Sequence, residues 1–404
     1  MNIFYLHQHF APPESSGNNR SLELAANWAS KGHKVTILCG SGNFDKSLSW
    51  FVIFKKYKYK GFTVLRLNVP YSHYYPFLQR IISFIKYLIF SLLLAFKMRK
   101  ADIIYASSTP LTIGITALWL KYFFNKPYVF ETVDLWPDTP IQMGVIKNNF
   151  LKKALWSLEK IIYKKASHII CLSEGMKELI VSKKINDEKV TIAHNGTDCS
   201  YFTPCINKDF VKGKLNLTKG KFTILYAGTI GEANGLHFLA EVANEIQKNS
   251  QHSVQFLIVG NGNRKEELKT YCQNKSLQNI LFLDTVPKAM VKQFFDAADT
   301  GFVCFAPYPI LETNSANKFY DYLAAGLPVL INYGGWQKHY LDEFHAGFSQ
   351  RTPKEMAKQI ILLSQNKNLL AEMGKNARSL AETRFDRKDI AEKILDIFTS
   401  IKSN

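Results

Sequence analysis

The chain has 404 residues, of which 47% are hydrophobic and 21% are charged. This length exceeds what one hydrophobic core usually organises, so two domains are expected, and the composition excludes a disordered or low-complexity protein. The cysteines form no CxxC pair and have no histidine ligands nearby, which excludes a zinc site or a disulfide framework and predicts reduced thiols in a cytosolic protein. The six cysteines are Cys39, Cys171, Cys199, Cys205, Cys272 and Cys304.

Positive charge is concentrated at the start of the chain. The formal net charge is +18, and residues 1–100 hold fourteen lysines and arginines against three acidic residues. Such an asymmetry predicts an anionic partner, which composition alone leaves open between nucleic acid, acidic lipid and a phosphorylated substrate.

A βαβ unit opens the chain. Strands are expected at residues 3–7 and 34–39, with a helix at 20–31 between them, and this spacing predicts a parallel sheet. Because the sequence starts directly with a strand, no signal peptide is expected. The polar loop around Gly17 runs straight into the helix, so it either holds an anion at the helix N-terminus or is a plain connection.

Residues 55–67 alternate lysine with tyrosine and then become apolar, which predicts a basic strand or hairpin. Alternating cations and aromatic rings also occur on surfaces that follow a nucleic-acid backbone. No DNA- or RNA-binding motif accompanies them, so a strand with one solvated edge is the preferred interpretation and no nucleic-acid partner is expected.

An apolar segment follows at residues 77–96. It is shorter than the roughly 20 apolar residues of a membrane span, and its apolar side chains cover nearly the whole helix circumference. A helix lying in an anionic lipid surface and a fully buried core helix both fit the pattern, and the cations favour the lipid surface. The five cations expected to bind the membrane are Arg80, Lys86, Lys97, Arg99 and Lys100.

Strand and helix patterns then alternate up to residue 200. Asp134 follows the strand expected at residues 128–131, at the sheet edge where ligands sit in open α/β proteins. Its carboxylate either orients or deprotonates an acceptor hydroxyl, or caps the turn at residues 135–138. Residues 199–221 are polar and contain Pro, Gly and Lys, which is typical of an interdomain linker.

A second α/β series begins at residue 222, and its most informative stretch is residues 312–331. A polar loop at 312–317 precedes a helix expected at 318–325, Gly326, and a buried strand at 328–331. Lys318 lies in the first helical turn, where a cation opposes the helix dipole. A bound phosphate would explain the lysine, and a solvated surface lysine is the alternative that this stretch leaves open.

Together the two series predict an α/β fold with two Rossmann-like domains facing across a cleft. The domains are expected at residues 1–200 and 201–380, followed by a C-terminal helix at 381–404 that packs back on the first domain. A nucleotide-bearing ligand is expected in the cleft. The loops after Gly228 and Gly260 lack the GxGxxG pattern, which argues against a dehydrogenase.

Several motifs of the second half occur in the order and spacing of one known family. They include Ile192-Ala-His-Asn-Gly-Thr-Asp, Leu225-Tyr-Ala-Gly-Thr-Ile-Gly, Leu257-Ile-Val-Gly-Asn-Gly-Asn-Arg, Asp284-Thr-Val-Pro and Lys318-Phe-Tyr-Asp-Tyr-Leu-Ala-Ala-Gly-Leu-Pro-Val. On these motifs the chain resembles the retaining GT-B glycosyltransferases of family four. Asp134-Leu-Trp-Pro-Asp-Thr is similar to the DLWPES motif of a bacterial O-antigen and capsule branch that includes L-fucosamine transferases.

The resemblance implies how a donor nucleotide would be held. Asp321 stands where the family binds the ribose hydroxyls, whereas the first glutamate of that pair falls at Thr313, beside Glu312. The usual cations after the first strand of the donor domain are missing, since Thr229 and Asn234 occupy that loop. Lys318 and Arg264 are therefore expected to supply the positive charge that binds the diphosphate. The remaining donor-binding positions that the resemblance implies are Gly17, Gly228, Gly231, Val286, Asn314, Ser315 and Asn317.

The implied reaction transfers a sugar from a nucleotide-diphosphate donor, expected to be a UDP-sugar, with retention of configuration. Amides and cations would stabilise the leaving diphosphate, with Lys318, Glu312 and Asp134 as the catalytic candidates, and no metal cofactor is expected. The acceptor expected is a polyprenyl-diphosphate-linked glycan at the inner face of the cytoplasmic membrane. The alternatives are a UDP-sugar 2-epimerase of the same fold and a non-catalytic, membrane-associated scaffold of a polysaccharide assembly complex.

Overall fold

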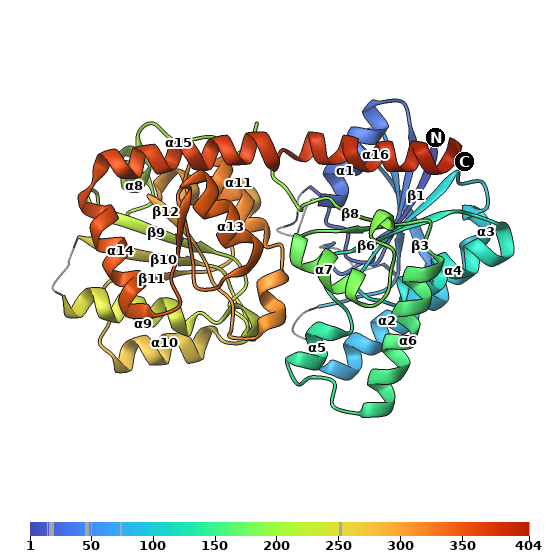
Figure 1. Cartoon of the computed structure of the whole chain (residues 1–404), viewed down its shortest axis with the longest axis horizontal. Coiled ribbons are helices and arrows are strands. Elements are labelled where there is room, and N and C mark those ends of the chain that lie inside the picture. Colours follow the sequence, from blue (N-terminus) through green and yellow to red (C-terminus); the bar gives the residue numbers. More distant parts are fainter. Residues whose placement is uncertain are drawn as a thin grey trace. The chain divides into compact units, whose positions relative to one another are not determined.

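The computed structural model describes residues 1–13, 15, 20–44, 48–49, 51–72, 75–249 and 253–403. The chain divides into two compact units. The first comprises Met1–His194 together with Lys388–Asn404, and the second comprises Asn195–Arg387. Each unit contains one sheet of mainly parallel strands with helices on both faces (Figure 1), which confirms the expected α/β fold with two Rossmann-like halves.

The sheet of the first unit has the strand order β3-β4-β2-β1-β5-β6-β7-β8, and only β3 and β4 pair antiparallel. Its strands are β1 (Asn2–Leu6), β2 (Lys34–Cys39), β3 (Phe54–Tyr59), β4 (Phe62–Leu67), β5 (Ile103–Ser107), β6 (Tyr128–Thr132), β7 (His168–Cys171) and β8 (Val190–Ile192). The expected lysine–tyrosine hairpin is therefore β3 and β4. Lys55, Lys56 and Lys58 are exposed, so β3 is the solvated edge of the sheet.

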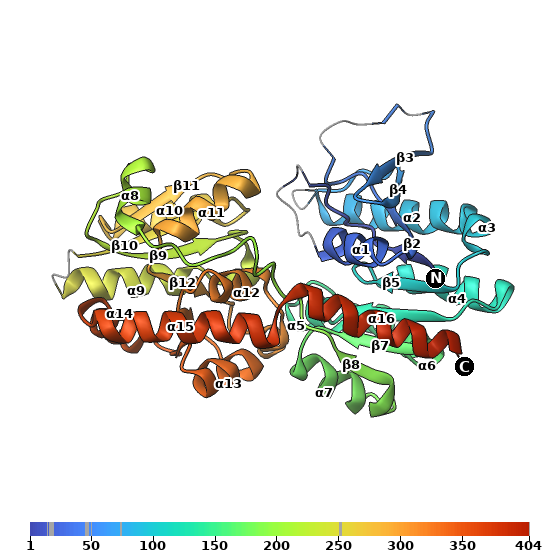
Figure 2. The same ribbon diagram turned by 90° about the horizontal axis from the view of Figure 1, so that it is seen from above.

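The helices of the first unit are α1 (Arg20–Ser30), α2 (Phe77–Leu93), α3 (Ala95–Met98), α4 (Ile113–Phe124), α5 (Asp138–Gln142), α6 (Asn149–Lys165), α7 (Glu174–Ser182) and α16 (Arg387–Ser403), with a 3-10 turn, η1, at Asp187–Lys189. Helices α1 and α16 cover one face of the sheet, and α2, α4 and α6 cover the other (Figures 1 and 2). The indole of Trp28 in α1 donates a hydrogen bond to Ala391 O in α16. This bond joins the C-terminal helix to the first helix of the same unit.

Helix α2 is not the fully buried core helix that the sequence left open. Phe84 and Tyr87 are buried against the sheet, whereas the opposite face is apolar and exposed. The exposed stripe consists of Leu78, Ile82, Ile85, Ile89 and Leu93. In the part of the chain that the structure describes, none of the helices combines the length and apolar character that a membrane span requires.

The second unit has a wholly parallel sheet with the order β11-β10-β9-β12-β13-β14. Its strands are β9 (Phe222–Ala227), β10 (Val254–Val259), β11 (Ile280–Leu283), β12 (Thr300–Val303), β13 (Val329–Ile331) and β14 (Gly347–Ser349). Its helices are α8 (Lys208–Lys214), α9 (His237–Lys248), α10 (Lys265–Asn274), α11 (Lys288–Ala297), α12 (Asn317–Ala324), α13 (Gly335–Phe344), α14 (Pro353–Gln365) and α15 (Lys367–Arg384), with 3-10 turns η2 (Glu232–Asn234) and η3 (Pro309–Thr313).

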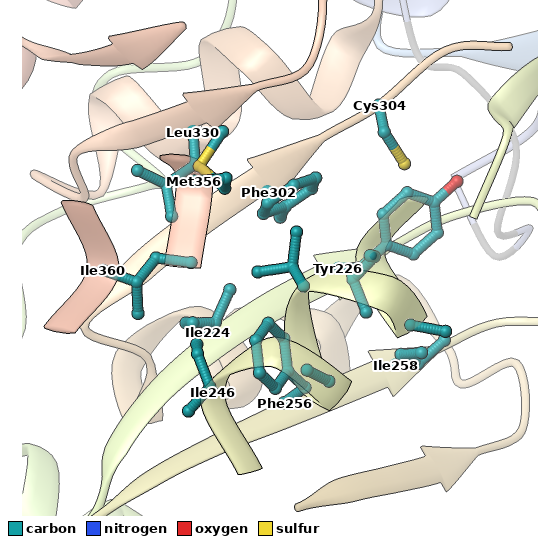
Figure 3. Packing of buried hydrophobic residues seen from close by; sticks show 14 of the residues in the cluster. Ile224, Tyr226, Ile246, Phe256, Ile258, Phe302, Cys304, Leu330, Met356 and Ile360 are labelled. Carbon is teal, nitrogen blue, oxygen red and sulfur yellow. The ribbon is translucent and has the colours of Figure 1, made fainter. Parts of the chain in front are cut away.

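The core of the second unit lies between this sheet and helices α9, α10 and α14. Ile224, Phe256 and Phe302 pack from the strands against Ile246 and Ile360 from the helices (Figure 3). On the other face, Tyr322 of α12 lies so close to β12 that a β-carbon at Gly301 would meet its ring. Helix α12 is thereby held firmly on the sheet, which fixes the position of its first turn.

The segment at residues 199–221, expected to be a linker, belongs to the second unit instead. It contains α8, and Lys212 in this helix is buried, with its Nζ donating to Lys221 O and pairing with Asp299 at 2.9 Å. The expectation was wrong because polar, Lys-rich composition does not require solvation: this lysine pairs with the buried carboxylate of Asp299. Helices α7 and α13 were not expected from the sequence.

Candidate active site

The chain order of the second sheet reverses between β9 and β12, which are neighbours in space. Loops leaving the carboxyl ends of such neighbouring strands diverge and leave room for a ligand. Here the two loops touch at one point, where Ala306 N donates to Ala233 O at 2.9 Å. Gly235 has φ +56°, and a β-carbon on it would lie 2.7 Å from Ala306 N, so the approach requires glycine.

A pocket of about 570 Å³ opens beside this contact. Three residues predicted from the sequence line it: Gly231, Arg264 and Glu312. Arg264 is 46% exposed in its side chain, and its Nε donates to Glu232 Oε2 at 2.7 Å. Glu312 pairs with Arg351, whose Nη2 lies 2.8 Å from Oε1. Both predicted groups are thus already engaged in ion pairs, and a diphosphate would have to compete with both Glu232 and Glu267 for Arg264.

Lys318 lies in the first turn of α12, and its ammonium nitrogen lies 3.8 Å from the centre of the Tyr226 ring. Tyr226 is buried at the end of β9, beside Cys304, as Figure 3 shows. The nitrogen would also lie 2.8 Å from a β-carbon at Gly228, which has φ +149°. Lys318 is therefore half-buried on an aromatic face, and the solvated surface lysine that the sequence left open is wrong.

Burial lowers the pKa of Lys318 to about 8. The cause is desolvation, which disfavours the charged form, and no carboxylate forms an ion pair with this lysine among the described residues. The Tyr226 ring offers only a weak attraction compared with an anion. The position thus holds a cation that the fold itself does not neutralise.

The start of α12 offers polar groups beside this cation. Within the described ranges no side chain caps the helix, and Asn317 Oδ1 is buried without a hydrogen-bond partner. Asn195 Nδ2 donates to Ser315 O at 3.1 Å, and Ser315 Oγ lies 2.5 Å from Tyr320 OH. These bonds fix the loop before the helix, so the first-turn N–H groups keep a defined direction.

Asp321 lies one turn further along α12. Its Oδ1 accepts a hydrogen bond from Thr197 Oγ1 at 2.7 Å. Thr197 is buried and belongs to the segment that enters the second unit. The carboxylate is therefore held in one orientation before any ligand arrives.

The structure brings the predicted donor residues into two groups. Gly231, Arg264 and Glu312 surround the pocket, whereas Gly228, Ser315, Asn317, Lys318 and Asp321 gather at the start of α12. Asn314 lies between the groups and accepts a hydrogen bond from the Trp336 indole through its carbonyl. Val286 is half-buried in the loop after β11, at the same sheet edge but outside the pocket lining. Gly17 falls outside the described residues.

In the first unit, Asp134 follows β6 at the carboxyl edge of the sheet. Its Oδ2 accepts a hydrogen bond from Thr109 Oγ1 at 3.2 Å, from the loop after β5. Behind these loops, the buried pair Arg20–Glu131 closes at 2.9 Å, and Arg20 also donates to the carbonyls of Ala193 and His194. This pair ties the start of α1 to the strands beneath the loop of Asp134.

A second charged cluster fixes the far end of that loop. Lys183 donates to Asp138 and to both oxygens of Glu159, at 2.6 and 2.7 Å for Glu159. Trp156 Nε1 also donates to Asp138, at 2.8 Å. Burial raises the pKa of Glu159 to about 7, against the opposing attraction of Lys183.

The five cations predicted to face a membrane all lie on α2, α3 or the turn after α3. Lys86, Lys97, Arg99 and Lys100 are exposed, and Arg99 stacks on Phe96 at 3.8 Å. Arg80 is half-buried near Tyr71, where its charge opposes the rise in the Tyr71 pKa that burial causes. Four of the five are thus placed to meet an external anion.

Sequence reasoning missed Tyr226, Thr197, Asn195 and Arg351 as parts of the site. Asn195 and Thr197 lie within the motif Ile192-Ala-His-Asn-Gly-Thr-Asp, so their order along the chain was a usable signal. Tyr226 carries a weaker signal, an aromatic residue two positions before a glycine at a strand end. Within the described ranges, no group of three His, Cys, Asp or Glu side chains has the geometry to hold a metal ion.

Comparison with known families agrees with this geometry. Residues 17–201 match the model of Glycosyltransferase Family 4, and residues 207–380 match that of Glycosyl transferases group 1. The chain belongs to family four of the retaining glycosyltransferases, which have the GT-B fold and use nucleotide-sugar donors.

Individual relatives are distant. The chain is 26% identical over 349 residues to UDP-Gal:alpha-D-GlcNAc-diphosphoundecaprenol alpha-1,3-galactosyltransferase of Escherichia coli, covering 82% of this chain and 84% of that protein. Sucrose-phosphate synthase of Thermosynechococcus elongatus superposes with a TM-score of 0.79 at 16% identity, covering 100% and 99% of the two chains. Anabaena Alr3699/HepE in complex with UDP-glucose superposes with a TM-score of 0.73 at 17% identity, covering 99% and 100%.

Proposed function

We propose that this glycosyltransferase uses a UDP-sugar, with an N-acetylated amino sugar as the transferred group, and transfers the sugar to a polyprenyl-diphosphate-linked glycan in envelope polysaccharide synthesis. The second unit holds the donor, and the first unit holds the acceptor and contacts the membrane. The donor assignment draws support from the UDP-glucose complex of the Anabaena protein. The acceptor assignment draws support from the diphosphoundecaprenol-linked substrate named for the Escherichia coli relative.

The observation that carries the donor site is the environment of Lys318. Its ammonium group is desolvated over Tyr226 and lacks a carboxylate partner in the described structure, at the start of a helix with no capping side chain. A diphosphate here would receive the lysine charge and the helix N–H groups together. Since charge on the leaving diphosphate grows in the transition state, these groups stabilise the transition state more than the ground state.

The other donor contacts follow from the position of the diphosphate. Asp321, held by Thr197, accepts hydrogen bonds from the ribose hydroxyls, and the loop at Val286 contacts the base. Gly228 and Gly231 let the backbone after β9 approach the phosphates, and the loop at Asn314, Ser315 and Asn317 faces the donor sugar or the diphosphate. Arg264 contributes only if it leaves Glu232 and Glu267, so we assign it less of the binding energy than Lys318.

In the first unit, Asp134 accepts a hydrogen bond from the acceptor hydroxyl. Thr109 fixes one carboxylate oxygen, which leaves a defined orientation for a base or a hydrogen-bond acceptor. The exposed stripe of α2 and the cations Lys86, Lys97, Arg99 and Lys100 would lie against an anionic lipid surface at the inner face of the cytoplasmic membrane. This placement would bring a lipid-linked acceptor to the unit that carries Asp134.

A thermal-shift panel of UDP-, GDP- and dTDP-sugars tests the donor assignment, because a ligand stabilises the state that it binds. UDP-sugars should raise the melting temperature and the other two classes should not. Incubation with the donor alone separates transfer from epimerisation, since a 2-epimerase would convert the donor without an acceptor. A protein that neither binds nor hydrolyses any of these donors would support the non-catalytic scaffold instead.

A further inference from the structure

We infer that the start of helix α6 and the turn before it form a second site for an anionic lipid surface, separate from the stripe on α2. This inference rests on the proposed function, because it assumes that the first unit works at a membrane. It adds a contact surface that the apolar segment at residues 77–96 does not contain. The site consists of Val145, Phe150, Leu151 and Trp156, with Lys147, Lys152 and Lys153 between them.

Large apolar side chains are unusually exposed here. Phe150 is 84% exposed, and Val145, Leu151 and Trp156 are 52%, 44% and 39% exposed. The other face of α6 is buried, with Ile162 and Tyr163 fully packed, so the helix does not need these outer residues for its own core. Exposed apolar residues clustered on one element mark a surface that is covered by a partner.

The charge around the cluster selects the partner. From Thr139 to Leu158 the sequence contains three lysines and no acidic residue. The next acid, Glu159, is buried and already bound to Lys183. The acids that border the cluster, Asp138 and Glu159, are both paired with Lys183. A surface of aromatic and aliphatic side chains with lysines that are unpaired in the described structure fits the headgroup and upper acyl region of an anionic bilayer. The cations in the mixed-charge rim of a protein partner would find no unpaired acid among the described residues here.

Trp156 is held in place before any contact. Its indole nitrogen donates to Asp138 at 2.8 Å, and Asp138 is bound by Lys183. A ring that is already oriented loses little conformational entropy when it inserts into a surface. Tryptophan is also the side chain that settles at membrane interfaces, with its ring among the chains and its N–H toward a polar group.

The site lies on the same side of the sheet as α2. Helix α4 packs between α2 and α6 on this face (Figures 1 and 2). All three helices run back from the carboxyl edge of a parallel sheet, so the starts of α2 and α6 both lie toward the edge that carries Asp134. Two membrane contacts near this edge would hold the edge at the lipid surface more firmly than one helix could. A lipid-linked substrate would lie at that surface.

Quenching of tryptophan fluorescence tests the site in the full-length protein. Vesicles of phosphatidylglycerol with brominated acyl chains quench any indole that reaches the chains. We expect strong quenching in the wild type and loss of most of it in Trp156→Phe. The double variant Phe150→Ser/Leu151→Ser should bind phosphatidylglycerol vesicles roughly tenfold more weakly in sedimentation, because two apolar contacts are lost. Phe210→Ser, which changes an exposed phenylalanine of the second unit, is the matched control.

The outcomes separate this inference from the proposed function. If Trp156→Phe retains the quenching, or the double variant binds vesicles like the control, the α6 site is wrong while donor binding and the α2 surface stand. If vesicle binding needs α6 but UDP-sugars give no thermal shift, the α6 site stands and the donor assignment is wrong. Circular dichroism of the variants checks that each is folded. Binding to phosphatidylcholine vesicles as strong as to phosphatidylglycerol would overturn the requirement for an anionic surface.

Discussion

The ammonium group of Lys318 lies on the face of the Tyr226 ring, 3.8 Å from its centre, and the two residues come from different elements of the second unit. Tyr226 is the last residue but one of β9 and Lys318 is the second residue of α12. The contact therefore joins two structural features that bind phosphate in many proteins: a glycine loop at a strand end and a helix N-terminus. A desolvated lysine without an acidic partner is costly for the fold. Such a cost is what a binding site for an anion would be expected to carry.

Replacement of Lys318 by methionine should therefore have opposite effects on stability and on activity. Removing the buried charge should raise the free energy of unfolding of the unliganded protein at pH 7 by roughly 1–3 kcal/mol. Turnover should fall by roughly 100-fold or more, because a cation on the leaving diphosphate is lost. Chemical denaturation and initial-rate assays measure the two effects.

The pH dependence of this difference has a definite sign. The pKa of Lys318 is about 8 in the folded chain and 10.5 in its ordinary state. Between these pH values the unfolded chain binds more protons than the folded chain, so the free energy of unfolding of the wild type rises with pH. The extra stability of the Lys318→Met variant over the wild type therefore becomes smaller as the pH rises from about 8 to 10.5. Lys292→Met, at a lysine paired with Asp296 in the same unit, is the control. Near-normal turnover of Lys318→Met would show that another cation serves the diphosphate.

Gly228→Ala should weaken donor binding without unfolding the second unit. The new β-carbon would lie 2.8 Å from Lys318 Nζ, which is the movable end of a side chain, so the lysine would shift away from its place over Tyr226. The positive φ of +149° adds backbone strain. Gly220→Ala is a matched control, since Gly220 also has a positive φ, +74°, but no atom lies within 4 Å of its added β-carbon. Equal donor affinities of the two variants, measured by calorimetry with the best nucleotide, would contradict the proposed site.

Much of the fold was predictable because buried parallel strands are short apolar runs bounded by polar or glycine residues. The bounds of β2 match the strand predicted at residues 34–39, and those of β1, β6 and β13 lie within one residue of the strands predicted at 3–7, 128–131 and 328–331. Helices α7 and α13 were missed because they are short, with 9 and 10 residues. The burial of Lys318 was not predictable from its own helix, since Tyr226, which lies beneath it, is brought there only by the sheet. The bond between Thr197 and Asp321 is non-local for the same reason.

Asp321→Asn should raise the KM for the donor by roughly 10- to 100-fold, which corresponds to the loss of a charged hydrogen bond, with a smaller effect on kcat. The amide oxygen can still accept the bond from Thr197, so the helix should keep its place. A 2′-deoxyribose donor gives the sharper measurement. Wild type should lose affinity for this donor, whereas the variant should discriminate much less between the two donors. Equal discrimination by both proteins would show that Asp321 does not contact the 2′-hydroxyl.

Glu159→Gln tests the charged cluster that holds the loop after Asp134. Burial raises the pKa of Glu159 from 4.5 to about 7, although Lys183 lies 2.6 Å away and opposes the rise. Between these two pH values the folded chain binds more protons than the unfolded chain, so this group makes stability fall as pH rises from 4.5 to 7. Above pH 7 the buried carboxylate of Glu159 is ionised, and its desolvation lowers the free energy of unfolding. A glutamine at this position carries no charge and does not lower it in this way.

The variant should therefore be more stable than wild type at pH 8, by roughly 1–3 kcal/mol, and close to it at pH 5. Removing one partner of a buried ion pair usually destabilises, because the other charge is left alone. Here Lys183 keeps Asp138 as its counter-charge, so the usual penalty should be small. Glu245→Gln, in an exposed pair with Lys248, should show little difference at either pH. Urea unfolding at the two pH values decides the matter: a Glu159→Gln protein less stable than wild type at pH 8 would show that the attraction of Lys183 outweighs the cost of burial.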